Sequence, residues 1–117
     1  NKTYNGRLKG QLSDYSLKFL ASIVRGNMDT DGYIRLSHGI VGIKTASIYM
    51  MKQIHEILDM LEIENEFKVI EDFRPNCSTL YNIIIKRSML PIFYKKINFS
   101  HPRKRKILEE LVFKHIK

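Results

Sequence analysis

The sequence predicts an α+β fold in the order helix-β-β-helix-β-β-helix-helix, with an antiparallel sheet that carries its helices on one face. Two observations predict it. Apolar residues recur with the helical period up to residue 32 and with the strand period of two from residue 33 to 45. The same alternation returns between residues 66 and 86, after a second helical stretch. Strand pairs that are separated by helices favour an antiparallel sheet over a parallel one.

The composition is that of one globular domain with a basic surface. The 117 residues are 44% hydrophobic and 27% charged, which excludes disorder and suits a single core. We assign residues 1–12 to a polar N-terminal lead-in and residues 13–117 to one domain. No apolar run approaches the ~20 residues of a membrane span, so we expect no membrane partner. The net charge of +8 and the pI near 9.7 suit a polyanionic partner.

The first helix is predicted to open near Ser13, with Ser13 or Asp14 as its cap. One apolar stripe runs along it with helical spacing. The members of this stripe are Leu17, Leu20, Ala21, Val24 and Met28. A second stripe contains small residues four apart, which allow another backbone to come close. This second stripe consists of Phe19, Ser22, Ile23, Gly26 and Thr30. We therefore expect two packed faces on this helix, one for the core and one for a second helix.

The end of this helix carries two carboxylates, Asp29 and Asp31, where the helix dipole disfavours negative charge. Gly32 fits the left-handed position that ends many helices. A divalent cation is one reason for carboxylates at this place, because hard cations take carboxylate and carbonyl oxygens. A solvated turn is the other interpretation, and the small-residue stripe favours the cation.

The first strand pair follows directly. Tyr33, Arg35 and Ser37 alternate with apolar residues, residues 37–39 form the turn, and residues 40–45 return as the second strand. Val41 and Ile43 are expected to face the core and Lys44 to face outward. Ser47 then caps a second helix whose apolar stripe runs from Met50 to Leu61.

The second strand pair spans residues 66–72 and 79–86, with a loop at residues 73–78. Tyr81, Ile83 and Ile85 share one face of its second strand. A third helix is expected over residues 88–97, with Pro91 in its first turns. The last helix is expected to begin at Ser100. The single cysteine, Cys77, permits no internal disulfide and favours a reducing compartment.

Residues 19–34, which read FLASIVRGNMDTDGYI, resemble the motif of the LAGLIDADG homing endonucleases in its R-G-x-x-D-T-D-G form. The order of elements over residues 13–112 matches the core of that family, and residues 44–47 and 97–104 resemble two of its junctions. The motif occurs once, which resembles the single-motif, homodimeric type. The family implies an intron-encoded nuclease located in the cytoplasm, near the nucleoid, or in an organelle.

The resemblance implies a metal-dependent hydrolysis of DNA phosphodiesters. Asp31 and Lys104 would be catalytic, with Mg²⁺ or Mn²⁺ held by Asp31 and the Thr30 carbonyl. With one motif per chain, the catalytic pair requires a homodimer and hence a pseudo-palindromic double-stranded DNA site. The dimer interface would comprise Ser22, Ile23, Gly26, Asn27 and Thr30. Asn27 departs from the apolar residue that is usual in the family.

The outward side chains of the sheet are mostly polar or cationic, and a two-stranded ribbon can enter the major groove of DNA. Arg35 is the best candidate for a guanine contact. The basic run at residues 103–106 opens the last helix and suits phosphate contact. The predicted DNA-binding residues are Tyr33, Arg35, Ser37, Lys44, Lys68, Asn82, Lys86, Arg103 and Arg105.

Three functions fit these observations. The first is a site-specific homing endonuclease. The second is a non-cleaving nucleic-acid-binding descendant, such as an intron splicing cofactor or a regulator. The third is one half of a two-motif or intein-associated enzyme, which would need a partner chain with a second motif.

Overall fold

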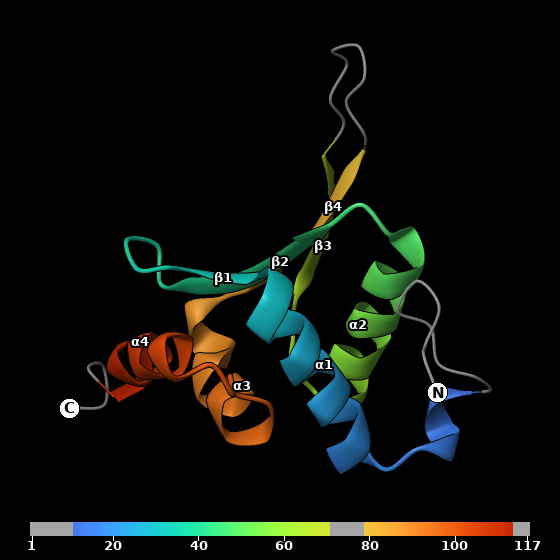
Figure 1. Cartoon of the computed structure of the whole chain (residues 1–117), viewed down its shortest axis with the longest axis horizontal. Helices are drawn as coiled ribbons and strands as arrows, with labels where there is room; N and C mark the ends of the chain where they lie inside the picture. The colour runs from blue at the N-terminus through green and yellow to red at the C-terminus, as the bar shows by residue number, and fades with distance from the viewer. Residues whose placement is uncertain (1–10, 71–78, 114–117) are drawn as a thin grey trace.

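The computed structural model describes residues 11–70 and 79–113. It is an α+β fold with a four-stranded antiparallel sheet of order β1-β2-β4-β3 (Figure 1). Figure 1 shows α1 and α2 against one side of the sheet, with α3 next to α1 and α4 beside α3, below β1. The elements are α1 (Leu17–Asp31), β1 (Gly32–Arg35), β2 (Ile40–Thr45), α2 (Ile48–Met60), β3 (Glu66–Ile70), β4 (Leu80–Ile85), α3 (Leu90–Lys96) and α4 (Pro102–Phe113). The predicted fold class and element order are confirmed.

Parts of the sequence prediction lie outside the described residues. These are most of the lead-in of residues 1–12, the loop of residues 73–78 with Cys77, and the chain end after residue 113. Within residues 11–70 and 79–113, no helix is long and apolar enough to cross a membrane.

The start of α1 differs from the prediction. Ser16, and neither Ser13 nor Asp14, caps the helix, and its hydroxyl accepts a hydrogen bond of 3.1 Å from the N–H of Phe19. Ser13 and Asp14 belong to a separate 3₁₀ turn at Leu12–Asp14. The Asp14 carboxylate there accepts from the N–H of Gln11, so it is used locally before the helix begins.

The core lies between the inner face of the sheet and α1 and α2, and it continues into buried residues of α3, of the segment after it and of α4. Val41 and Ile43 of β2 and Ile83 and Ile85 of β4 have no solvent exposure, as predicted from the period-two pattern. The fully buried helix residues that meet them are Leu20, Val24, Met28, Met51, Ile54, Ile57 and Leu58. Leu17 was predicted to be in the same stripe but is 50% exposed, because it lies in the first turn of α1 at the edge of the core.

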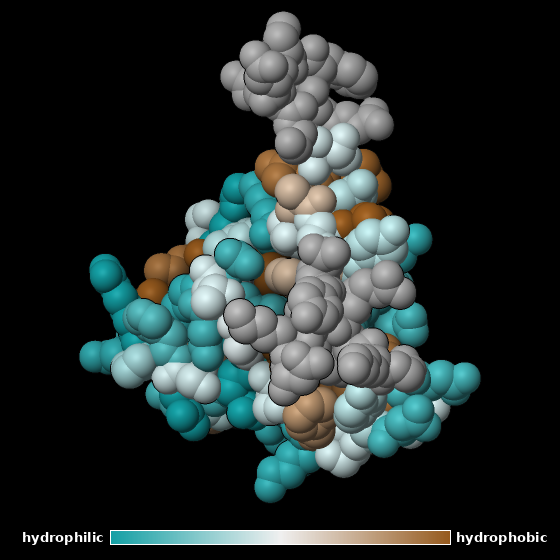
Figure 2. Space-filling view, turned by 45° about the vertical axis from the view of Figure 1, so that its right-hand side comes forward, coloured by the Kyte–Doolittle hydropathy of each residue, from teal (hydrophilic) through white to brown (hydrophobic). Residues whose placement is uncertain are grey.

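Part of the exposed apolar surface lies at one end of the sheet. Figure 2 shows brown, hydrophobic surface near the top of the molecule, next to the ends of β3 and β4. The residues there are Val69, Ile70 and Leu80, which are 54%, 38% and 38% exposed. Ile70 pairs with Leu80 across the two strands, on the face away from the helices. Ile84, which pairs with Glu66, lies on the same outer face.

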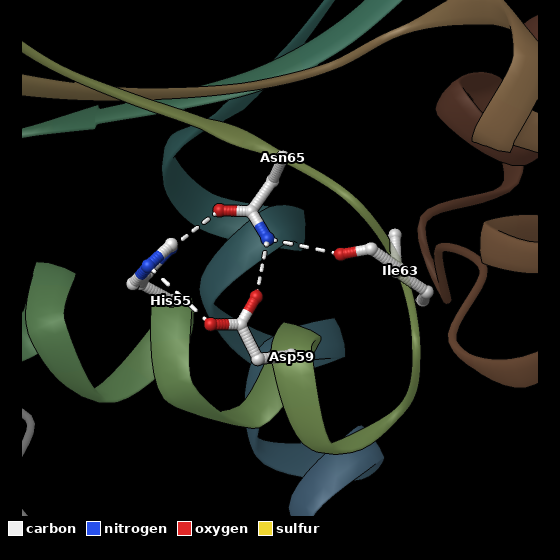
Figure 3. Close-up of polar contacts among 4 residues, drawn as sticks. All are labelled: His55, Asp59, Ile63 and Asn65. Carbon is white, nitrogen blue, oxygen red and sulfur yellow. Dashed lines mark hydrogen bonds and ion pairs between the residues drawn. The ribbon is translucent and has the colours of Figure 1, made fainter.

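A polar network joins the end of α2 to the start of β3 (Figure 3). The Asn65 amide donates to the Ile63 carbonyl at 2.9 Å and to Asp59 at 3.3 Å. The His55 ring contacts the Asn65 Oδ1 atom at 2.6 Å through Nδ1 and Asp59 at 3.4 Å through Nε2. Both ring nitrogens of His55 are thus engaged, which gives a structural role to a histidine for which the sequence predicted none.

The C-terminal helices begin later than predicted. A 3₁₀ turn at Arg87–Met89 precedes α3, with Pro91 in its first turn as expected. The last helix begins at Pro102 and not at Ser100, because the N–H groups of Ser100 and His101 are bound by a side chain of α1. This contact is part of the candidate site.

Candidate active site and nucleic-acid interface

Charged side chains connect the end of α1 with the start of α4 in both directions. The Oδ1 atom of Asp29 accepts hydrogen bonds from the N–H groups of Ser100 at 2.9 Å and His101 at 3.1 Å. The Lys104 ammonium donates to the carbonyls of Met28 at 3.2 Å, Asp29 at 3.0 Å and Gly32 at 2.9 Å. Each charge is unfavourable at the end of its own helix but favourable at the end of the other. These contacts explain why a carboxylate ends α1 and a cation opens α4.

Arg25, one turn before Asp29 in α1, binds the linker between α3 and α4, residues 97–101. Its Nε–H donates to the Ile97 carbonyl at 2.6 Å, at the end of α3. Two polar residues of the R-G-x-x-D-T-D-G segment, Arg25 and Asp29, therefore fix residues 97–101 against α1. The sequence contains no local signal for either contact, because the partners lie more than 70 residues away.

Gly32 ends α1 by a different device from the predicted one. Its φ of −74° and ψ of 155° are extended, so it does not occupy the left-handed region. A Cβ atom at this position would lie 2.5 Å from the carbonyl oxygen of Met28 and 2.9 Å from its Cα atom. Gly32 is therefore required for close backbone approach, which brings its carbonyl to Lys104.

Asp31 contrasts with Asp29. It is exposed, and its carboxylate makes no hydrogen bond or ion pair with any described residue. Thr30 is also exposed, and its hydroxyl donates back to the carbonyls of Gly26 and Asn27 at 3.3 and 3.1 Å. Of the two acidic residues at this helix end, Asp31 is the more available to a ligand, because Asp29 is half-buried and its Oδ1 atom is bonded.

One chain supplies a single carboxylate to this place. Among residues 11–70 and 79–113, no three His, Cys, Asp or Glu side chains lie close enough to hold a metal ion. Asp31 fits a divalent cation by its chemistry and exposure, but one carboxylate is a poor site alone. The residues therefore suit a metal only if a second copy brings another Asp31 beside the first.

The small-residue stripe of α1 is uncovered. Ser22, Gly26 and Thr30 are exposed, and Ile23 and Asn27 are half-buried. A Cβ atom on Gly26 would meet nothing within 4 Å. The Ser22 hydroxyl donates to the Phe19 carbonyl at 2.6 Å, so the hydroxyls of this stripe are satisfied within α1. The face offers small, hydrogen-bonded groups and no described element packs on Gly26.

A hydrogen-bonded tyrosine lies in the middle of the outer face of the sheet. Tyr33 extends from β1 across Gly42 of β2, and its hydroxyl donates to the Oδ1 atom of Asn82 on β4 at 2.9 Å. The ammonium of Lys44 lies 5.6 Å and the guanidinium of Arg35 lies 5.9 Å from the Tyr33 ring centre. Both contacts are within the range of cation–π attraction. Lys44, Asn82 and Lys68 form one row across β2, β4 and β3.

The other predicted DNA-binding residues are more scattered. Ser37 lies in the turn after β1 and not in the strand, with its hydroxyl 2.9 Å from His38. Lys86 follows β4 and lies 3.8 Å from Glu66. Arg103 is exposed in the first turn of α4, and Arg105 lies 3.8 Å from Glu109. Asn82 is only 6% exposed, so it supports Tyr33 more than it offers a free edge.

Gly42 was not among the predicted site residues, although Tyr33 lies directly over it. A Cβ atom there would overlap the Tyr33 ring and lie 2.9 Å from the Ile83 carbonyl. The available signal was a glycine inside an apolar strand, which indicates close approach of another group.

Comparisons of this chain with protein-family models and with curated proteins gave no match.

Gly42→Ala is expected to destabilise the protein by about 1–3 kcal/mol, because the added methyl group must displace Tyr33 or the strand. Gly26→Ala is the matched control. Gly26 lies in an exposed helix position with open space around it, so alanine should stabilise the monomer by up to about 1 kcal/mol. Urea denaturation of the two variants measures both effects. A Gly42→Ala variant as stable as wild type would contradict the Tyr33 placement.

Proposed function

We propose that this protein is a site-specific double-stranded DNA endonuclease of the LAGLIDADG homing type that acts as a homodimer. The proposal rests on one observation, the different surroundings of Asp29 and Asp31 at the end of α1. The Oδ1 atom of Asp29 accepts from the N–H groups of Ser100 and His101 before α4, whereas Asp31 is exposed beside the small-residue face with no described partner. This is where a two-fold copy of α1 would bring a second Asp31.

The dimer would complete the site. Two α1 helices that pack through Ser22, Gly26 and Thr30 would bring their C-terminal ends together. Asp31 and the Thr30 carbonyl of each chain would then hold Mg²⁺ or Mn²⁺. When bound, the metal would lower the pKa of an attacking water and stabilise charge on the phosphate. The chain's own contribution is to hold the two carboxylates in place.

Lys104 is a positioning residue in this proposal. Its ammonium donates to three carbonyls around the end of α1, including that of Gly32 next to Asp31. These bonds fix the backbone that carries Asp31. The resemblance also assigns this position to stabilisation of charge on the phosphate. Lys104 could do so only through long-range attraction while its donors stay on these carbonyls.

The outer sheet face would bind DNA. Lys44, Lys68 and Arg35 are exposed there, around the locked Tyr33–Asn82 pair. The hairpin of β1 and β2 and the strands β3 and β4 extend to different sides of the molecule in Figure 1, with the helices beneath them. Such a surface suits a duplex laid along the sheet, with strands in the major groove. Exposed Ile70 would be available to a thymine methyl group.

Arg35→Ala is expected to relax base preference at one position in each half-site, at a cost of about 1–3 kcal/mol there. Wild-type affinity should fall with salt with a slope of about −0.9 per neutralised phosphate. Lys52→Ala is the control, since Lys52 is an exposed cation on α2 and not on the sheet. Binding to a library of half-site variants measures the preference. A uniform loss over all sequences would show that Arg35 contacts only the backbone.

Gly26→Leu is expected to abolish self-association, because the larger side chain forces the two α1 helices apart. The monomer should keep its fold, since nothing described lies within 4 Å of the added group's first carbon. Sedimentation velocity measures the association, and circular dichroism checks the fold. An unchanged dimer would contradict the interface.

A non-cleaving nucleic-acid binder is the second candidate. One observation favours it. All three N–H donors of Lys104 bind backbone carbonyls, so this ammonium has no donor left for a phosphate at Asp31. This candidate keeps the sheet face and the dimer but predicts no cutting with either metal ion. Cleavage assays on a bound site separate the two.

A further inference from the structure

A basic hollow lies between α1, α3 and the start of α4, apart from both Asp31 and the sheet. Its volume is about 480 Å³, and its lining comes from Arg25, from α3, from the linker to α4 and from Arg105. No residue of the sheet lines it. Three of its side chains are cations, Arg25, Lys95 and Arg105, and none is a carboxylate. Apart from Arg105, which is also a predicted DNA contact, the proposed nuclease function uses none of this surface.

Arg25 is the most informative of the three cations. Its side chain is half-buried, and its Nε atom is fixed on the Ile97 carbonyl at 2.6 Å. No carboxylate of the described residues lies within ion-pair distance of it. Partly buried guanidinium groups usually have an anionic partner, because removal from water is costly without one. The remaining donors of Arg25 are a preorganised fork without such a partner.

The nearby carboxylates, Glu109 and Asp29, compensate this positive charge only in part, because three cations line the hollow. Lys95 is exposed and makes no ion pair with a described residue, and Arg105 lies 3.8 Å from Glu109. Glu109 also accepts a hydrogen bond from the Tyr94 hydroxyl at 2.9 Å, and this bond raises the pKa of Tyr94. Tyr94 therefore stays neutral at physiological pH and adds no negative charge. Asp29 is the other nearby carboxylate, and it is bonded to Ser100 and His101.

We infer that this hollow binds a phosphate group. A guanidinium fork, an ammonium and a second guanidinium that converge from three elements match the several oxygens and the double charge of a phosphate. The ligand could be a free phosphate or polyphosphate, or a phosphate of a nucleic-acid strand that leaves the sheet face. The chemistry of recognition is the same for both.

Calorimetric titration of the whole chain with inorganic pyrophosphate tests the inference. Wild type should bind one equivalent saturably, and Lys95→Gln and Arg105→Gln should each weaken binding by about tenfold. Lys18→Gln and Lys52→Gln are the controls, since both are exposed cations of α1 and α2 that do not line the hollow. They should change affinity by less than about twofold. Absence of saturable binding, or equal weakening in the controls, would overturn the inference.

A second arm distinguishes the two sources of phosphate. The pyrophosphate titration is repeated with a saturating duplex of random sequence. Loss of pyrophosphate binding, together with weaker duplex binding by Lys95→Gln, would identify the nucleic-acid strand as the source. Unchanged pyrophosphate affinity would identify a free anion, and either result supports the pocket. Asp31→Asn should leave pyrophosphate binding unchanged, so a failed nuclease proposal would not imply a failed pocket.

Discussion

Asp31→Asn should abolish strand cleavage while the protein stays folded and still binds DNA. The neutral amide is a poor ligand for Mg²⁺, so the proposed site loses one carboxylate from each chain. The substitution should cost no stability, because Asp31 is exposed and makes no described polar contact. Removal of a negative charge from the C-terminal end of α1 should even stabilise the apo protein by about 0.3–1 kcal/mol. Cleavage and gel-shift assays on the same duplex measure the two activities.

Asp29→Asn is the matched control for this prediction. It changes the same group two residues earlier, where the carboxylate accepts from Ser100 and His101. The amide oxygen of asparagine can still accept both hydrogen bonds but carries no charge, so the fold should lose about 1–2 kcal/mol of stability. We therefore expect Asp29→Asn to lower the stability of the fold and Asp31→Asn to abolish cleavage. If Asp31→Asn cuts at the wild-type rate, the assignment of the site is wrong.

Lys104→Met should destabilise the protein by about 2–4 kcal/mol, the largest loss of stability that we expect from a single exposed or half-buried cation. The ammonium donates to three carbonyls at the end of α1, and methionine removes all three hydrogen bonds, although the Met28 carbonyl keeps the N–H of Gly32. The melting temperature should fall on the order of 10 °C. Thermal denaturation followed by circular dichroism measures the change.

Lys106→Met serves as the control for Lys104, because Lys106 is exposed two residues further along the same helix. Its effect should stay within about 0.5 kcal/mol. If both variants melt together while only Lys104→Met loses cleavage, then Lys104 acts on the phosphate directly and does not position α1.

Local sequence patterns were sufficient for the framework of this fold. The period-two alternation identified the buried face of β2 and β4, and the predicted second strand, residues 40–45, matches β2. The Ser47 cap of α2 was also predicted correctly, with its hydroxyl 3.2 Å from the Met50 nitrogen. These features depend on neighbours a few residues apart, which the sequence displays directly.

Contacts between distant segments could not be predicted in this way. Asp29 and Asp31 look alike in the sequence, and only the approach of residues 100 and 101 separates them. Gly32 was assigned to a left-handed position, because close contact with the Met28 carbonyl leaves no mark in local composition. The predicted caps of α1, Ser13 and Asp14, belong to a 3₁₀ turn that was not predicted, and Ser16 caps the helix instead.

The most direct test of the proposed function is cleavage of a plasmid library of random sites, with and without Mg²⁺, followed by mapping of the new ends. The proposal predicts double-strand breaks only with the metal ion, clustered at one pseudo-palindromic sequence whose two half-sites reflect the two-fold dimer. If the purified wild type selects a site from the same library but never cuts it with Mg²⁺ or Mn²⁺, the endonuclease proposal is contradicted and the non-cleaving binder takes its place.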